Sequence, residues 1–265
     1  MKKLSFNEIR SHARVALRGN YATLIISGLL AIIVFLLMSS FVEHVVSILY
    51  FLLFKDKHAL AYKIVSYGCN LLTSLIAAPL FYGRIVQYMK VARNTSPDIG
   101  DIFKPYDVYP KTIVTITFLK YLCMIIAFLP IFCYFIAAFI IGNLDLIILL
   151  ICEIISLALL IKVALDFSMT PFYFMDHPDM PALQIIKESR ALIKGKRIKY
   201  MLFLLSFIGY FLLGILTWFI GFIWILPYIS TSRSCFYQAL INDGKRRKPK
   251  PDWRPYISNA DGFRS

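Results

Sequence analysis

The sequence predicts an all-α, polytopic helical membrane protein. We expect about six transmembrane helices in three hairpins, together with two amphipathic interfacial helices. Apolar residues make up 59% of the chain and the mean hydropathy is +0.69, whereas a soluble domain is nearer half apolar. Several apolar runs reach the ~20 residues that a helix needs to cross a bilayer. Helices are the expected spanning element because lipid offers no partner to an unpaired backbone group.

The chain begins with an amphipathic segment, Ser5 to Gly19, which leads into the first span. Gly19 suits a helix C-cap that bends the chain into the membrane, and the first span runs from Tyr21 to about Phe41. The apolar run from Val45 to Phe54 is too short to cross alone, so it is either an extension of the first helix or an interfacial turn. On a helix, one face of the first segment is apolar and should rest against acyl chains; it carries Phe6, Ile9, Ala13, Ala16 and Leu17.

Three further spans follow. The second covers about Ala59 to Tyr82, after a loop at Lys55 to His58, and carries Pro79 near its end. The third runs from near Lys111 to about Ile141 and ends at a Gly142-Asn143 turn. The fourth covers about Leu144 to Phe174 and carries Pro171 near its end. Both of the last two are long enough to tilt or to protrude.

The second amphipathic helix extends from Pro181 to Gly195, and Asp179 is its predicted N-cap. The apolar block that follows, Tyr200 to Tyr237, is too long for one span. We divide it near Thr217 to Gly221 into a third hairpin, because Gly214 and Gly221 bracket a tight turn.

The formal net charge is +14, and the basic residues lie between apolar runs rather than on a soluble domain. This pattern indicates the positive-inside signal rather than nucleic-acid binding. It predicts a multi-pass protein of the cytoplasmic membrane with both termini in the cytoplasm. Residues 1–243 form a single membrane domain, and residues 244–265 are a basic, disordered cytoplasmic tail.

An internal repeat of an amphipathic helix plus hairpin is predicted near residues 5–42 and 181–229. Arg14 aligns with Arg190 and Gly19 aligns with Gly195, and both copies lead directly into a span. Any amphipathic helix shares this period, so a chance match is the alternative. A repeat with both copies on one side of the membrane is of the parallel kind, not the inverted kind.

The chain resembles a family of bacterial integral membrane proteins, domain of unknown function family 975. The N-terminal Arg10-x-x-Ala-Arg-x-Ala-Leu-Arg-Gly-Asn20 is similar to the opening motif of that family, and Ser189-Arg190-x-Leu-Ile-Lys-Gly195 to its second motif. Leu205-Ser-Phe-Ile-Gly209, Trp224-x-x-Pro-Tyr228 and Phe236-Tyr237 are similar to its C-terminal signature. The resemblance implies the membrane fold and no particular activity. The chain departs from the family where two turn glycines are expected and only Gly221 is present.

Ionisable residues inside spans are functional candidates, because each costs roughly 2.5–3.5 kcal/mol at mid-membrane on insertion scales. Lys162 and Asp166 are four residues apart and can pair on one helix face. With Lys120 they form either a buried functional cluster or a structural ion pair beside a lysine that reaches the interface. Glu153 has no evident partner. The candidate intramembrane charged cluster is therefore Lys120, Glu153, Lys162 and Asp166.

Basic residues on the two amphipathic helices are candidates for binding anionic lipid headgroups, at about 1 kcal/mol each. The alternative is that they only set the topology. These residues are Arg14, Arg18, Arg190, Lys194 and Arg197.

No catalytic motif, cofactor motif or metal-binding pattern is present in the sequence, and the five cysteines form no Cys-x-x-Cys pair. We therefore expect no cofactor and no metal. The first hypothesis is a non-enzymatic protein that binds lipids or a membrane partner, such as a transport complex or a membrane-active peptide. The alternatives are a permease whose path is lined by the charged cluster, and an intramembrane lipid-modifying enzyme. The oligomeric state is left open.

Overall fold

The computed structural model describes residues 5–54, 59–142 and 145–245, and within them the secondary structure is entirely helical. The predicted all-α class is therefore confirmed. The predicted loop at 55–58, Asn143, Leu144 and almost all of the predicted tail lie outside the described residues. The elements are α1 (Phe6–Leu17), α2 (Tyr21–Phe54), α3 (Ala59–Ile76), α4 (Ala78–Ala92), the 3-10 turn η1 (Ile99–Ile102), α5 (Lys104–Val108), α6 (Pro110–Ile141), α7 (Leu146–Asp166), α8 (Thr170–Asp176), α9 (Ala182–Ile193), α10 (Arg197–Leu205), α11 (Ile208–Leu216) and α12 (Phe222–Lys245).

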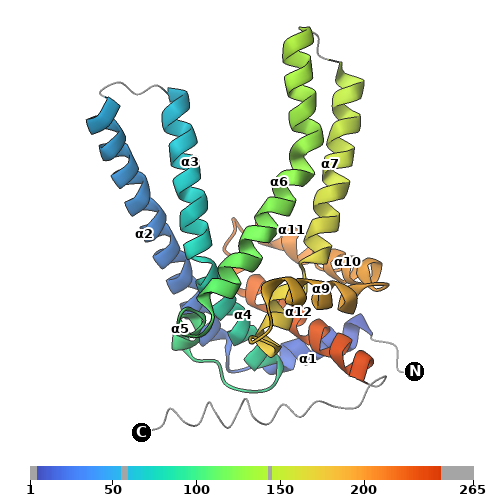
Figure 1. Ribbon diagram of the computed structural model, residues 1–265. Helices are drawn as coiled ribbons and strands as arrows, with labels where there is room; N and C mark the ends of the chain where they lie inside the picture. Colours follow the sequence, from blue (N-terminus) through green and yellow to red (C-terminus); the bar gives the residue numbers. More distant parts are fainter. Residues whose placement is uncertain (1–4, 55–58, 143–144, 246–265) are drawn as a thin grey trace.

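Two long helical hairpins rise from a packed base. Figure 1 shows α2 with α3 on one side and α6 with α7 on the other, and the two pairs diverge as they leave the base. The remaining helices gather below them, so that α1, α4, α9, α10 and α12 lie close together. We call these two parts the hairpins and the base.

Five helical stretches of the described chain are long and apolar enough to cross a membrane. The predicted sixth crossing, α12, is not among them, because it carries the polar run Ser230-Thr231-Ser232 together with Arg233 and Asp243. In Figure 1, α10, α11 and α12 lie within the base rather than beside the two hairpins. The five stretches are Tyr21–Leu52, Ala61–Ala92, Pro110–Ile141, Leu146–Asp176 and Arg197–Leu216.

The first span is longer than predicted, and three others are interrupted, including the fifth, where α10 ends at Leu205 and α11 begins at Ile208. Helix α2 continues without a break to Phe54, so the run after Val45 extends the first helix. The second span breaks at Ala77 and the fourth breaks between Asp166 and Thr170. In both cases a proline follows at the second position of the new helix. A proline has no N–H to donate and its ring displaces the carbonyl four residues earlier, so it ends one helix and begins the next.

The two amphipathic helices end in the same way. Each has 12 residues, and each is followed by a residue near φ −60° and ψ 130° and then by a glycine with positive φ, +82° at Gly19 and +78° at Gly195. The N–H of Asn20 donates to the carbonyl of Leu17 at 3.0 Å, and that of Lys196 to the carbonyl of Ile193 at 2.9 Å. These are type II turns, whose third position requires a positive φ. Glycine is therefore needed at both turns.

The apolar faces of these helices are covered by protein. Ile9, Ala13 and Leu17 of α1 are buried against α12 and α4, although we expected that face to rest on acyl chains. Ile185 and Ile193 of α9 are likewise fully buried. The 3.6-residue periodicity identified the apolar faces correctly, but it does not reveal what covers them.

The core of the base is aromatic. The rings of Phe203 and Phe236 stack with centroids 4.9 Å apart, and Phe6 and Phe207 pack against Phe203 at 5.5 and 5.2 Å. Phe203, Phe207 and Phe236 have no exposed surface. In the hairpins, by contrast, most large apolar side chains point outward, as Phe139 does with 90% of its surface exposed. Those side chains are suited to lipid rather than to water.

The chain reverses at Thr217 to Gly221, as predicted, but not through glycine conformations. The residues with positive φ there are Trp218 and Phe219. Gly214 serves close packing instead, because a Cβ on it would come within 2.8 Å of the Phe222 ring. The predicted N-cap of the second amphipathic helix was wrong as well. Pro181 occupies that position, and the Asp179 carboxylate accepts a hydrogen bond from Tyr109.

Candidate functional site

Two arginines converge on one aspartate where α7 reaches the base. Asp166 is the last residue of α7 and is largely buried. Nη2 of Arg197, at the start of α10, lies 2.5 Å from Oδ1 of Asp166, and Nε of Arg190, on α9, lies 4.0 Å from Oδ2. The guanidinium of Arg190 also lies over the Phe167 ring, 4.9 Å from its centroid. We call this group the Asp166 junction.

The junction carries more positive charge than it neutralises. Two guanidinium groups share one carboxylate, and the side chains of Arg190 and Arg197 remain 40% and 37% exposed. The Nε atoms of both arginines are buried and have no hydrogen-bond partner within the described chain. Guanidinium donors in a fixed fork match the oxygens of a phosphate or carboxylate. The junction therefore has unused capacity for an anion.

The predicted intramembrane cluster does not assemble as expected. Asp166 pairs with Arg197 rather than with Lys162, and the Lys162 side chain points outward on α7. Lys120, half-buried on α6, forms no hydrogen bond or ion pair with the part of the chain that is described. Glu153 lies elsewhere along α7, beside a pocket of its own. A single path lined by all four residues would need them to converge, and they do not.

Of the five predicted lipid-binding residues, the structure brings together only Arg190 and Arg197. Lys194 is exposed in the type II turn between them. Arg14 and Arg18 are exposed on and after α1, the helix that corresponds to α9 in the predicted repeat. Sequence spacing indicated the basic faces of the helices. It could not show that Asp166, distant in sequence, lies between two of the arginines.

A half-buried arginine that the sequence did not single out holds α4 against α2. Nη1 of Arg84 donates to the Leu24 carbonyl at 2.6 Å, to Ser27 Oγ at 2.6 Å and to Gln87 Oε1 at 2.9 Å, and its Nη2 donates to the Tyr88 hydroxyl. All of these acceptors are neutral. The only sequence signal was a charged residue five positions after Pro79, which is equally typical of the loop after a span.

Carboxylates tie other parts of the base together. Asp176 of α8 accepts from Arg93 at 2.6 Å and from the Tyr237 hydroxyl at 2.9 Å, so it joins α4 and α12. Asp101 of η1 is fully buried and accepts from Lys90 and Lys104, at 2.8 and 2.6 Å. These contacts fix the shape of the base, and they involve none of the residues of the junction or of the pocket.

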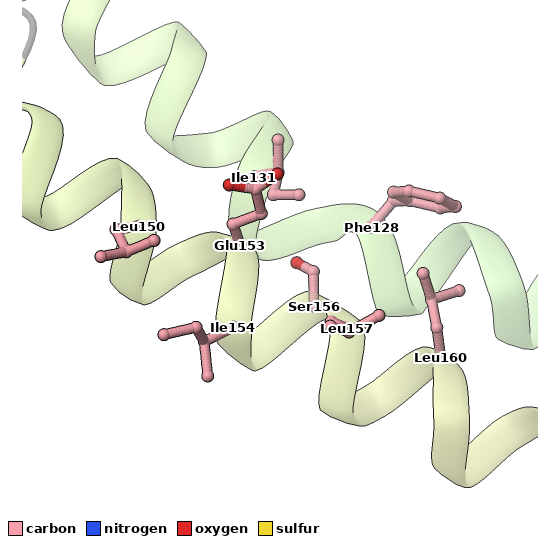
Figure 2. A pocket seen from close by; sticks show the side chains of 8 residues that line it. All are labelled: Phe128, Ile131, Leu150, Glu153, Ile154, Ser156, Leu157 and Leu160. Carbon is pink, nitrogen blue, oxygen red and sulfur yellow. The ribbon is translucent and has the colours of Figure 1, made fainter. Parts of the chain in front are cut away.

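A pocket of about 380 Å³ opens between α6 and α7, inside the second hairpin. Figure 2 shows the side chains around it, which are apolar apart from Glu153 and Ser156. The hydroxyl of Ser156 is buried and has no hydrogen-bond partner within the described residues.

Glu43, in the first hairpin, contrasts with Glu153. It accepts hydrogen bonds from three α3 side chains, Tyr62 at 2.8 Å, Ser66 at 2.7 Å and Asn70 at 3.0 Å. Glu153 forms no hydrogen bond or ion pair with other described residues. Among the residues that the structure covers, no three His, Cys, Asp or Glu side chains are placed to hold a metal ion.

Comparison with known proteins gives the family but no activity. No curated protein and no solved structure matches the chain. One family, described as protein of unknown function (DUF975), matches residues 1–243, which is nearly the whole chain. The resemblance of the Arg10–Asn20 and Ser189–Gly195 motifs pointed to the same family. The chain therefore belongs to the DUF975 family of proteins of unknown function.

Proposed function

We propose that this protein is a non-catalytic membrane component that binds anionic phospholipid headgroups, and that Arg190 and Arg197 at the Asp166 junction hold the phosphate. The observation that carries the proposal is the surplus of guanidinium donors around one carboxylate. A phosphate diester could accept from N–H groups on the exposed parts of the two guanidinium groups without displacing Asp166 from Arg197.

The position of the junction supports this assignment. Helix α7 has 21 residues, so it is about 31 Å long, close to the ~30 Å thickness of the hydrocarbon core. When α7 crosses the membrane, Asp166 at its end lies at the boundary where headgroups lie. The positive-inside pattern assigns this side to the cytoplasmic leaflet, whose surface potential is negative.

The remaining basic residues add a less specific attraction. Arg14, Arg18 and Lys194 are exposed, and each basic side chain near an anionic surface contributes about 1 kcal/mol. This part should weaken as salt is added, because the screening length is only about 8 Å at physiological ionic strength.

The test measures thermal unfolding of the full chain in mild detergent, with added phosphatidylglycerol or phosphatidylcholine. We expect phosphatidylglycerol to raise the unfolding temperature of the wild type more than phosphatidylcholine does, because a ligand that binds only the folded state stabilises it. In the Arg190→Gln/Arg197→Gln variant this difference should vanish. Lys187→Gln is the matched control, because Lys187 is an exposed cation on the same helix.

Asp166→Asn separates lipid binding from a structural role. It removes the competing carboxylate, so the variant should be less stable without lipid and yet gain at least as much from phosphatidylglycerol as the wild type. The junction would not be a headgroup site if the double arginine variant kept the full stabilisation by phosphatidylglycerol. The same would follow if Lys187→Gln lost as much of that stabilisation as the double arginine variant.

A further inference from the structure

The pocket between α6 and α7 has the features of a ligand site that is separate from the Asp166 junction. Phe128 and Ile131 of α6 and Leu157 and Leu160 of α7 line it, and Glu153 and Ser156 supply its polar groups. In Figure 2 the Ser156 hydroxyl is directed from α7 toward α6. The volume of the pocket, about 380 Å³, is within the usual range of small-molecule sites, about 300–1,000 Å³.

Ser156 lacks a hydrogen bond that several other helical serines of this protein form. A serine in a helix commonly donates back to a carbonyl three or four residues earlier. Ser27, Ser74 and Ser189 do so, at 3.3, 2.7 and 3.0 Å. Ser156 is only 1% exposed but makes no such bond. A buried hydroxyl without a partner is costly, so this one is available to a ligand.

The opposite wall carries a second irregularity. Pro130 lies inside α6, between the pocket residues Phe128 and Ile131. A proline has no N–H, so the Ile126 carbonyl loses its usual helical donor. The pocket therefore lies beside the turn of α6 that contains Pro130 and lacks this hydrogen bond.

The depth of the pocket limits the kind of ligand. Ser156 is ten residues from each end of α7, about 15 Å along the helix axis, which places it near the middle of the bilayer. Phospholipid headgroups do not reach that depth. An ionised carboxylate is costly at that depth, whereas a carboxyl that carries its proton is a hydrogen-bond donor.

We propose that the α6–α7 pocket binds a neutral, ring-bearing lipophile with carbonyl oxygens, of the chemical class of a quinone. Glu153 and Ser156 donate hydrogen bonds to the ligand oxygens, and the Phe128 ring packs against the ligand ring. A neutral ligand is required because the site offers no charge to balance an ionic one. The inference does not depend on lipid binding at the junction, which lies at the end of α7.

The test uses a hydrophobic carbodiimide on the full chain in lipid nanodiscs, with duroquinone as the probe. The reagent adds to a protonated carboxyl in an apolar setting and leaves a stable N-acylurea, which peptide mass spectrometry locates. Duroquinone is fully substituted, so it does not alkylate the free cysteines. We expect Glu153 to be labelled and duroquinone to reduce its labelling rate at least fivefold.

Two variants and an internal reference make the result decisive. Glu153→Gln should remove the label at this site. Ser156→Ala should keep the label but lose most of the protection by duroquinone. Glu43, already hydrogen-bonded by three side chains, should show no protection in any variant. Labelling of Glu153 that duroquinone does not slow, equal protection in wild type and Ser156→Ala, or an unreactive Glu153 would each overturn the proposal.

Discussion

The base and the hairpins are both rich in apolar residues, but their side chains are packed differently. In the base, aromatic side chains bury one another, and carboxylates such as Asp101 and Asp176 have cationic or hydroxyl partners. In the hairpins the apolar side chains face outward, and contacts between helices run along one face only. The difference shows that protein packing determines the structure of the base, whereas lipid must complete the surroundings of the hairpins.

The largest expected effect is the loss of an aromatic ring from the base. Phe203→Ala should lower the free energy of unfolding by about 3–5 kcal/mol, because Phe203 is fully buried among three other rings. Phe139→Ala removes the same atoms from an exposed position in the second hairpin and should cost much less. Denaturant unfolding in detergent, followed by circular dichroism, measures both. Similar losses for the two variants would contradict the division between base and hairpins.

A methyl group added in the base should be the next most harmful change. A Cβ on Gly83 of α4 would overlap the backbone of Ile102 in η1, whereas a Cβ on Gly68 of α3 would meet nothing. Gly83→Ala should therefore cost about 1–3 kcal/mol. Gly68→Ala should be neutral or stabilise by up to about 1 kcal/mol, because alanine favours helix. Unfolding midpoints compare the two directly, and a neutral Gly83→Ala would show that α4 and η1 can separate at no cost.

Replacing the glycine in either type II turn should lower the free energy of unfolding by a similar amount. Gly19 and Gly195 have positive φ, and a Cβ on either would meet no atom within 4 Å, so strain of the left-handed conformation is the only expected penalty. Gly19→Ala and Gly195→Ala should each cost about 1–2 kcal/mol. Unfolding midpoints of the two single variants and the double variant measure this, and the double variant should show the sum, because the turns are separate. A cost at one turn only would argue against equivalent roles in the predicted repeat.

The smallest expected effect is a pH dependence from Asp101. Its burial would raise the pKa, but hydrogen bonds from Lys104, Lys90 and the Asp98 N–H outweigh that, and the pKa lies below its ordinary value. The carboxylate therefore stabilises the fold above the unfolded-state pKa of about 3.9. The stabilisation is lost as the pH falls through the lower folded-state pKa. In denaturant unfolding, Asp101→Asn should be less stable than wild type at neutral pH, and the gap should narrow as the solution is acidified below that pKa.

The sequence predicted where the helices lie along the chain better than it predicted which helices pack against one another. Apolar run length predicted the helices of both hairpins, and the glycines at 19, 142 and 195 predicted three helix ends, each with positive φ. The breaks at Ala77 and after Asp166 were missed, although Pro79 and Pro171 were noted. A proline near the end of a span is compatible with a kink, a break or an end.

The candidate sites were predicted only in part. Glu153 was correctly singled out as lacking an evident partner, and Arg190 and Arg197 were named for their basic helix faces. Their convergence on Asp166 depends on how α7, α9 and α10 pack, and no local pattern encodes that. Ser156 carries no sequence signal, because a serine in an apolar helix normally bonds to its own backbone.

The polar groups of the first hairpin have a consequence for bilayer thickness. Arg84 is anchored at Leu24 and Ser27 of α2, and the hydrogen-bonded Glu43 lies 16 residues beyond Ser27 on the same helix. That spacing is about 24 Å, and the side chains between the two are free of charge. A membrane of that thickness leaves both groups at its surfaces. A thicker membrane would place Arg84 or Glu43 inside the hydrocarbon region unless the hairpin tilts or the bilayer thins locally. Either adjustment costs a fraction of a kcal/mol per Å of mismatch. The hairpin thus favours membranes of a particular thickness.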